Sequence, residues 1–332
     1  MIRYETQIIT LPEFKMSEIY HFSNPKVCYT LYGDWQDGKK KRALFFHGFS
    51  SNSELHTWWK KFNFLELLKS YNIICINSLG SSHGTLGPNS INTEVNAPYF
   101  KQFPKITISD TVDFSVKVLQ HLGFLKFDLV FGCSLGGMQS LDMFLRYSEM
   151  SEKFISVAGT PLSYMTKFIN LAQAKMIDEA DLDKIESALG FARFFFRLSC
   201  TTEQALNIFL KKYDAFSEVH DVDILKRCFV EDNIKFQTQF SPYSNSLYLK
   251  MMSYFSLGDI LLSEKKSTAS LLLVSIENDQ FTPESSVNGV FESMSSNKYP
   301  VQLRHFETAF GHEAWIVDGG RFYEFIKKDL YF

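Results

Sequence analysis

The segment Gly132-Cys133-Ser134-Leu135-Gly136 places a serine between two glycines in the pattern G-x-S-x-G. An apolar run precedes it and apolar residues at helical spacing follow it, so the serine lies on a sharp turn between a strand and a helix. Glycines are needed there because larger side chains would clash. The turn raises the hydroxyl above a sheet, beside helix N–H groups that stabilise anionic intermediates. The segment predicts a nucleophilic Ser134, and a glycine-rich turn with a capping serine is the alternative.

A serine hydroxyl is a weak nucleophile near neutral pH and requires a neighbouring base. With this motif the partners follow in the chain order serine, acid, histidine. Of the eight histidines, His305 and His312 follow the start of the last strand-like runs. His305 lies inside the run 301–306, which is typical of a packed or surface histidine. His312 lies in a loop before the final helix, and we predict that it is the base.

The acid must hold the imidazole in one tautomer and stabilise its charged form. The apolar run 271–276 ends in Glu277-Asn278-Asp279, which offers two carboxylates. Asp279 lies deeper in the loop, four residues before Pro283. We favour Asp279 as the acid, with Glu277 as the alternative, and a solvated loop carboxylate is the simpler interpretation of either.

Two backbone N–H groups are expected to bind the oxyanion. One is the N–H of Leu135, directly after the nucleophile. The other comes from the segment His47-Gly48-Phe49-Ser50, with Phe49 as the expected donor. His47 is expected to order this loop and to take no part in the chemistry.

The elements that position these residues alternate between strands and helices. Continuous apolar runs are typical of strands that are buried on both faces of a parallel sheet. Thr107 and Asp110 form a capping pair at the start of a helix that ends near Gly123. We expect residues 162–262 to form a mostly helical lid, with its clearest helices at 189–198 and 203–213, inserted into a core of residues 1–161 and 263–332. The strand runs are 6–11, 26–32, 43–47, 73–77, 127–132, 154–158, 271–276 and 301–306. The pattern predicts an α/β-hydrolase fold, with a mostly parallel, doubly wound sheet.

Composition excludes several other classes of function. The formal net charge is −3 and no long basic run occurs, so we expect neither a nucleic-acid partner nor an anionic membrane. No metal-ligand spacing is present, and the glycine clusters lack the placement of dinucleotide motifs. The five cysteines are scattered without a C-x-x-C pair, which favours reduced thiols. The N-terminus lacks the layout of a signal peptide, and charges interrupt every apolar run, so we expect a cytoplasmic protein.

Several longer segments resemble the homoserine O-acetyltransferase group of α/β-hydrolase-fold proteins. The resemblance is patchy, but its segments occur in order over most of the chain from about Ala43 to Phe325. The segments 77–92 and 103–110 are more specific than G-x-S-x-G and distinguish this group from ordinary esterases. The matching segments are 77–92 (NSLGSSHGTLGPNSIN), 103–110 (FPKITISD), 132–141 (GCSLGGMQSL), 190–193 (GFAR), 243–249 (YSNSLYL) and 311–314 (GHEA).

The resemblance implies ping-pong acyl transfer from acetyl-CoA, as a substrate and not as a bound cofactor, through an acyl-enzyme on Ser134. It implies an amino-acid alcohol as acceptor, homoserine by default, whose carboxylate binds Arg193. The group carries an Asp that contacts the acceptor at the position of Glu313, so the chain departs from it by one methylene. Members commonly form homodimers through the lid, and the product feeds methionine biosynthesis.

Two other functions use the same residues or the same fold. A carboxylesterase results if water reaches the acyl-serine, because the difference depends on how well the lid excludes water. A non-catalytic binding protein is a third possibility. The chain order Ser134, Asp279, His312 argues against it.

Overall fold

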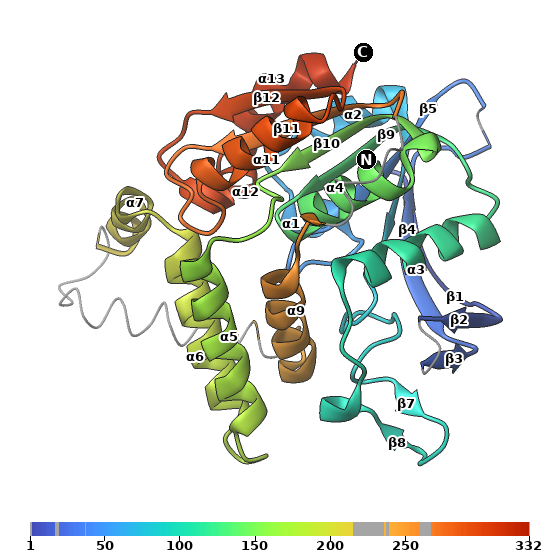
Figure 1. Cartoon of the computed structure of the whole chain (residues 1–332), viewed down its shortest axis with the longest axis vertical. Coiled ribbons are helices and arrows are strands. Elements are labelled where there is room, and N and C mark those ends of the chain that lie inside the picture. The colour runs from blue at the N-terminus through green and yellow to red at the C-terminus, as the bar shows by residue number, and fades with distance from the viewer. Residues whose placement is uncertain are drawn as a thin grey trace.

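The computed structural model describes residues 2–16, 20–36, 38–214, 236, 239–258 and 267–331, with backbone only for 209–214. Its centre is an eight-stranded sheet in the order β1-β4-β6-β5-β9-β10-β11-β12 (Figure 1). β4 is antiparallel to both neighbours, and every pair from β6 to β12 is parallel. The strands are β1 (Tyr4–Thr10), β4 (Lys26–Tyr32), β5 (Lys41–Phe46), β6 (Tyr71–Ile76), β9 (Phe127–Cys133), β10 (Ser151–Val157), β11 (Ser270–Ile276) and β12 (Val301–Phe306).

The predicted strands are therefore confirmed, and so is the mostly parallel sheet. Two small hairpins lie outside it: β2 (Glu13–Lys15) with β3 (His21–Ser23), and β7 (Ile91–Asn92) with β8 (Ala97–Pro98). The central strands are buried along almost their whole length, because helices cover both faces.

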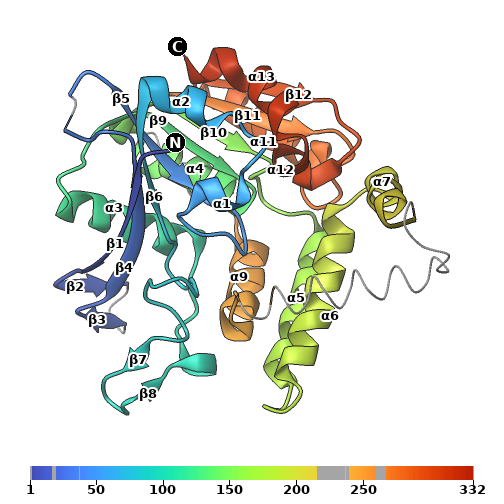
Figure 2. The same ribbon diagram turned by 180° about the vertical axis from the view of Figure 1, so that it is seen from behind.

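Helices cover the two faces of the sheet (Figures 1 and 2). Thr107 caps α3 with the predicted capping box, in which Asp110 binds the Thr107 N–H and Thr107 binds the Asp110 N–H. On one face lie α3 (Ile108–His121), α4 (Leu135–Arg146) and α11 (Glu284–Ser296); on the other lie α1 (Leu55–Trp58), α2 (Phe64–Ser70), α12 (Ala314–Val317) and α13 (Gly319–Leu330).

Between β10 and β11 the described residues are mostly helical. α5 packs against both α6 and α9, and these helices extend beyond the sheet (Figures 1 and 2). The predicted helices at 189–198 and 203–213 correspond to α6 and α7, although α6 starts earlier. The helices are α5 (Tyr164–Glu179), α6 (Ile185–Cys200), α7 (Glu203–Asp214) and α9 (Pro242–Tyr254). The predicted lid, 162–262, also contains residues outside the described ranges. In the ranges that are described, no helix is long and apolar enough to span a membrane.

Two glycines bring α4 into backbone contact with the end of β10. A Cβ on Gly137 would lie 2.7 Å from the carbonyl oxygen of Val157. A Cβ on Gly159 would lie 2.2 Å from the carbonyl carbon of Gly137. The Ser156 hydroxyl donates a hydrogen bond to the Gly137 carbonyl at 2.8 Å. The helix that follows Ser134 is thus held against the sheet by backbone contact.

We expect Gly159→Ala to lower the free energy of unfolding by about 1–3 kcal/mol or more, because overpacking against backbone cannot relax by side-chain movement. Urea denaturation followed by circular dichroism measures this change. The control is Gly289→Ala in α11, where a Cβ meets nothing within 4 Å. That variant is expected to gain about 0.5–1 kcal/mol from helix propensity. Equal effects of the two substitutions would contradict the role of the α4 contact.

Candidate active site

Ser134 lies at the tight turn between β9 and α4, with φ 56° and ψ −121°. A positive φ is strained for a residue with a side chain, and such strain gathers at functional sites. The flanking glycines permit the turn: a Cβ on Gly132 would lie 2.0 Å from the Gly136 carbonyl oxygen, and one on Gly136 would lie 2.2 Å from the Phe46 carbonyl oxygen. The Ser134 N–H donates to the Val157 carbonyl at 2.8 Å, which fixes the turn to β10.

The structure brings Ser134, His312 and Asp279 into one hydrogen-bonded chain. The Nδ1–H group of His312 donates to Oδ2 of Asp279 at 2.7 Å. Its Nε2 accepts from the Ser134 hydroxyl at 2.7 Å. The His312 and Asp279 side chains are 4% and 0% exposed. A buried serine–histidine–carboxylate chain can activate the hydroxyl for attack on a carbonyl carbon.

The two alternative residues from the sequence lie elsewhere. Glu277 accepts a hydrogen bond from the Thr308 N–H at 2.7 Å, so it ties the end of β11 to the loop that leads to His312. His305 lies on β12, where its Nδ1 is 3.0 Å from the Ser275 hydroxyl. Both residues therefore have structural partners, and Asp279 is the carboxylate that contacts the imidazole.

The loop that carries Asp279 is fixed at several points. Oδ1 of Asp279 accepts from the Thr282 N–H at 2.8 Å, which leaves Oδ2 for His312. The Thr282 hydroxyl donates to the Ala158 carbonyl at 3.1 Å. The Phe281 ring is fully buried, with its centroid 4.7 Å from that of His312. These contacts fix the orientation of the carboxylate and restrict the imidazole.

His47 orders the loop after β5, as the sequence predicts. Its Nε2 accepts a hydrogen bond from the Ser78 N–H at 3.1 Å. Nδ1 therefore carries the proton and donates to the Gly48 carbonyl at 2.9 Å. Burial lowers the pKa of His47 to about 4, so the imidazole is neutral near pH 7.

Phe49 and Leu135 occupy the positions at which oxyanion donors are expected. Leu135 is the first residue of α4, and the first N–H groups of a helix have no partner within it. Phe49 follows Gly48, and a Cβ on Gly48 would lie 3.2 Å from the ring of Trp315, three residues after His312. The loop of Phe49 is thus packed against the segment that carries the base.

Aromatic rings from the lid and from the core surround the site. The Phe49 ring lies 4.6 Å from that of Phe196 on α6 and 5.7 Å from that of Phe240. Phe196 in turn lies 5.2 Å from Phe281. All four side chains are buried. These apolar rings reduce the exposure of Ser134 and of the His312 imidazole to water.

The predicted substrate-binding residues lie on facing elements, with one unexpected partner. Arg193 on α6 places its guanidinium 4.6 Å from the ring centroid of Phe236. Glu313, directly after His312, forms an ion pair of 3.9 Å with Arg197, one helical turn beyond Arg193. Sequence reasoning missed Arg197, although its spacing of four residues from Arg193 places both on one side of α6.

We expect the neutral His47 to make stability depend on pH. The pKa of His47 is about 4 in the folded protein and near 6.5 in the unfolded chain. Between these two pH values His47 binds a proton in the unfolded chain and is neutral in the folded protein. The free energy of unfolding should fall by about 3 kcal/mol as the pH drops from 6.5 to 4. Urea titrations at each pH should show a weaker dependence for His47→Asn than for the unaltered protein. Identical slopes would exclude this role of His47.

Residues 44–314 match the family described as alpha/beta hydrolase fold. The homoserine O-acetyltransferase of Methanococcus vannielii is 26% identical, and the match covers 98% of this chain and 73% of that protein. The homoserine O-succinyltransferase of Cupriavidus metallidurans is 27% identical over 77% of this chain and 70% of its own length. The resemblance to the homoserine O-acetyltransferase group thus extends over nearly the whole sequence.

Solved structures agree on the fold. A homoserine O-acetyltransferase from Bacillus anthracis superposes with a TM-score of 0.82 at 18% identity, covering 100% of this chain and 97% of that one. An acetylester hydrolase from Corynebacterium glutamicum gives 0.77 at 16% identity, covering 99% and 95%. The arrangement of sheet and helices, the strained serine turn and the match over residues 44–314 lead to one assignment: the chain belongs to the alpha/beta hydrolase fold family.

Proposed function

We propose that this protein is an O-acyltransferase that moves a short acyl group from acyl-CoA to the hydroxyl of a small amino acid, homoserine by default. The observation that carries the proposal is the buried chain Ser134–His312–Asp279 beneath the aromatic rings of the lid. The choice of acyl transfer and of homoserine is supported by the names of the relatives.

In the first half-reaction Ser134 is the nucleophile. Its Oγ attacks the thioester carbonyl while Nε2 of His312 takes the hydroxyl proton. The oxyanion receives hydrogen bonds from the N–H groups of Leu135 and Phe49. The carbon–sulfur bond then breaks, and His312 returns the proton to the departing CoA thiolate. Asp279 stabilises the imidazolium that exists between these two transfers.

In the second half-reaction the acceptor hydroxyl replaces CoA. His312 removes its proton as the oxygen attacks the acyl-serine carbonyl. The ester to Ser134 breaks, and the proton returns to the serine oxygen. Atoms balance over the cycle: acyl-CoA and an alcohol give free CoA and an ester. The same steps with water give hydrolysis, so exclusion of water decides between transferase and esterase. The buried rings of Phe49, Phe196 and Phe240 favour the transferase.

The acceptor's charges match residues at the lid. The resemblance assigns its carboxylate to Arg193, whose fixed fork suits bidentate binding. Glu313 is the matching anion for the acceptor ammonium, and it is held by Arg197 at 3.9 Å. A partly exposed ion pair of this length is weak, so a bound zwitterion can replace it at little cost.

The remaining expectations, acetyl as the acyl group, a cytoplasmic location and a place in methionine biosynthesis, follow from the resemblance. So does a homodimer that pairs through the lid. It is supported by exposed apolar side chains on and beside α5, namely Tyr164, Phe168 and Leu182.

Thiol release from acetyl-CoA, measured with and without homoserine, tests the proposed reaction. We expect fast release only when homoserine is present, and none from Ser134→Ala, because the acyl-enzyme cannot form. Loss of activity on removal of such a nucleophile is on the order of 10⁶-fold. Steady release without homoserine would identify water as the acceptor. Release by Ser134→Ala at the normal rate would exclude the serine mechanism.

Acceptor analogues separate the roles of the charged residues. We expect Glu313→Gln to lose its preference for homoserine over 4-hydroxybutyrate, which lacks the ammonium. Arg193→Met should lose its preference over 3-aminopropan-1-ol, which lacks the carboxylate. Loss of the contact between the acceptor ammonium and Glu313, or between its carboxylate and Arg193, should raise the KM for homoserine by roughly tenfold or more. Hydrogen bonds to charged groups contribute about 1.5–3 kcal/mol.

Arg197→Met is the matched control for Arg193→Met, because both arginines lie on α6 one turn apart. If Arg197→Met alone loses the carboxylate preference, the acceptor carboxylate binds Arg197, and the assignment to Arg193 is wrong. Acylation by acetyl-CoA, measured in a single turnover, should remain unchanged in all three variants.

A further inference from the structure

One threonine hydroxyl joins the lid to the loop that carries His312. Thr202 lies between α6 and α7 and is 8% exposed. Its hydroxyl accepts a hydrogen bond from the Ala205 N–H at 3.0 Å, which caps the first turn of α7. The same hydroxyl donates its only hydrogen to the carbonyl of Ala309, three residues before His312. A single side chain therefore binds a lid helix and the loop of the base.

The methyl group of Thr202 contacts the residue next to the base. Gly311 has φ 60°, a conformation that favours glycine. A Cβ on Gly311 would lie 2.9 Å from Cγ2 of Thr202 and 3.1 Å from the carbonyl oxygen of Asn278. The turn that leads into His312 thus passes between the lid and the acid loop with no spare space.

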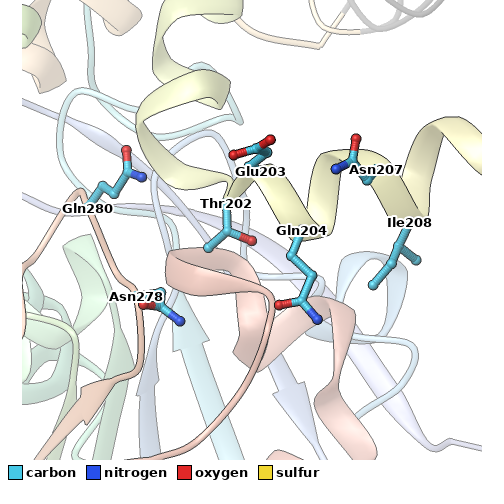
Figure 3. Close-up of a pocket in the computed structure, with 7 residues that line it drawn as sticks. All are labelled: Thr202, Glu203, Gln204, Asn207, Ile208, Asn278 and Gln280. Atoms are coloured by element: carbon cyan, nitrogen blue, oxygen red, sulfur yellow. The ribbon is translucent and has the colours of Figure 1, made fainter.

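Side-chain packing between α7 and the acid loop is incomplete. A cavity of about 600 Å³ lies there, and its wall includes Thr202, Gln204, Asn278 and Gln280 (Figure 3). Because this space is not filled by side chains, the hydroxyl of Thr202 is a principal link between the start of α7 and the loop of His312.

A second threonine makes the equivalent link on the acid side. Thr166, in the first turn of α5, is 2% exposed. Its hydroxyl lies 3.1 Å from the Phe281 carbonyl oxygen and 3.4 Å from that of Gln280. The N–H of Thr166 is itself bound by the Ser163 side chain at 3.2 Å, which caps α5. The lid thus contacts the loop of Asp279 from α5 and the loop of His312 from the α6–α7 joint.

We propose that Thr202 is a positioning residue through which the lid sets the location of His312, with Thr166 acting in the same way on the loop of Asp279. The inference rests on the proposed catalytic role of Ser134 and His312. The base must stay within hydrogen-bond reach of a hydroxyl on a different element, β9–α4, and a displacement of about 1 Å can cost roughly a hundredfold in rate. A lid that is displaced would release both loops, so the chemistry is coupled to lid closure.

Thr202→Val is the main test, because valine keeps the methyl contact with Gly311 and loses both hydrogen bonds. We expect the rate of acylation by p-nitrophenyl acetate to fall by about ten- to hundredfold, with KM changed little, because the base and not the ester site is displaced. Thr202→Ser retains the hydroxyl and should restore most of the rate. Thr201→Val, a change of the same size at the adjacent half-buried residue, is the matched control and should behave as the unaltered protein.

A spectroscopic signal separates positioning from general destabilisation. The His312 Nδ1 proton, hydrogen-bonded to a carboxylate, should give a far-downfield proton resonance that is absent in Asp279→Ala. Thr202→Val should shift or broaden it at a temperature where circular dichroism shows the protein folded, and Thr166→Val should do so too. An unchanged resonance together with an unchanged rate in folded Thr202→Val would overturn the inference.

The ester assay also separates failure of this inference from failure of the proposed function. If Ser134→Ala acylates as fast as the unaltered protein, the catalytic assignment itself is wrong. If Ser134→Ala is inactive and Thr202→Val is fully active with an unchanged resonance, only the positioning role is lost. A rate for Thr202→Val that falls only in proportion to its unfolded fraction also counts against positioning.

Discussion

Backbone contact between α4 and the sheet is the constraint on which the rest of the site depends. The helix begins so close to β5 and β10 that glycines are required at 136, 137 and 159. The chain can reach that position from β9 only through a tight turn, and Ser134 takes the strained φ of 56°. The strain persists because the surrounding backbone bonds determine it. The hydroxyl consequently lies at a helix N-terminus, where backbone N–H groups can stabilise negative charge.

His312 and Asp279 come from two separate loops, and His312 alone of the two contacts the Ser134 hydroxyl. The loops after β11 and β12 are joined by the bond between His312 and Asp279 and again by that between Glu277 and Thr308. Neighbouring parallel strands bring these loops together, because their carboxyl ends share one edge of the sheet. Glu277 therefore helps to hold the loop of His312 in place, although it does not contact the imidazole.

Local patterns allowed the strands, the serine turn and the chain order of the three hydrogen-bonded side chains to be predicted from the sequence. Apolar runs of strand length and G-x-S-x-G are short-range signals. Asp279 could be preferred over Glu277 only by its depth in the loop, since the choice depends on hydrogen bonds such as that to Thr282. The ion pair between Glu313 and Arg197 and the ring of Phe281 beside His312 could not be predicted. These contacts depend on how α6, the acid loop and the loop of His312 meet, and no local spacing encodes that.

The strand order has a consequence for the newly made chain. β10 pairs directly with β11, although residues 158–269 lie between them. Closing a loop of that length costs about 4 kcal/mol of chain entropy, which must be offset by contacts within the lid and along the strands. Until residue 276 leaves the ribosome, β10 can pair only with β9, and its other edge is open to association with other chains. Over the same interval Ser134 has neither Asp279 nor His312 beside it, so the hydrogen-bonded chain of the three residues forms only after the last strand has been made.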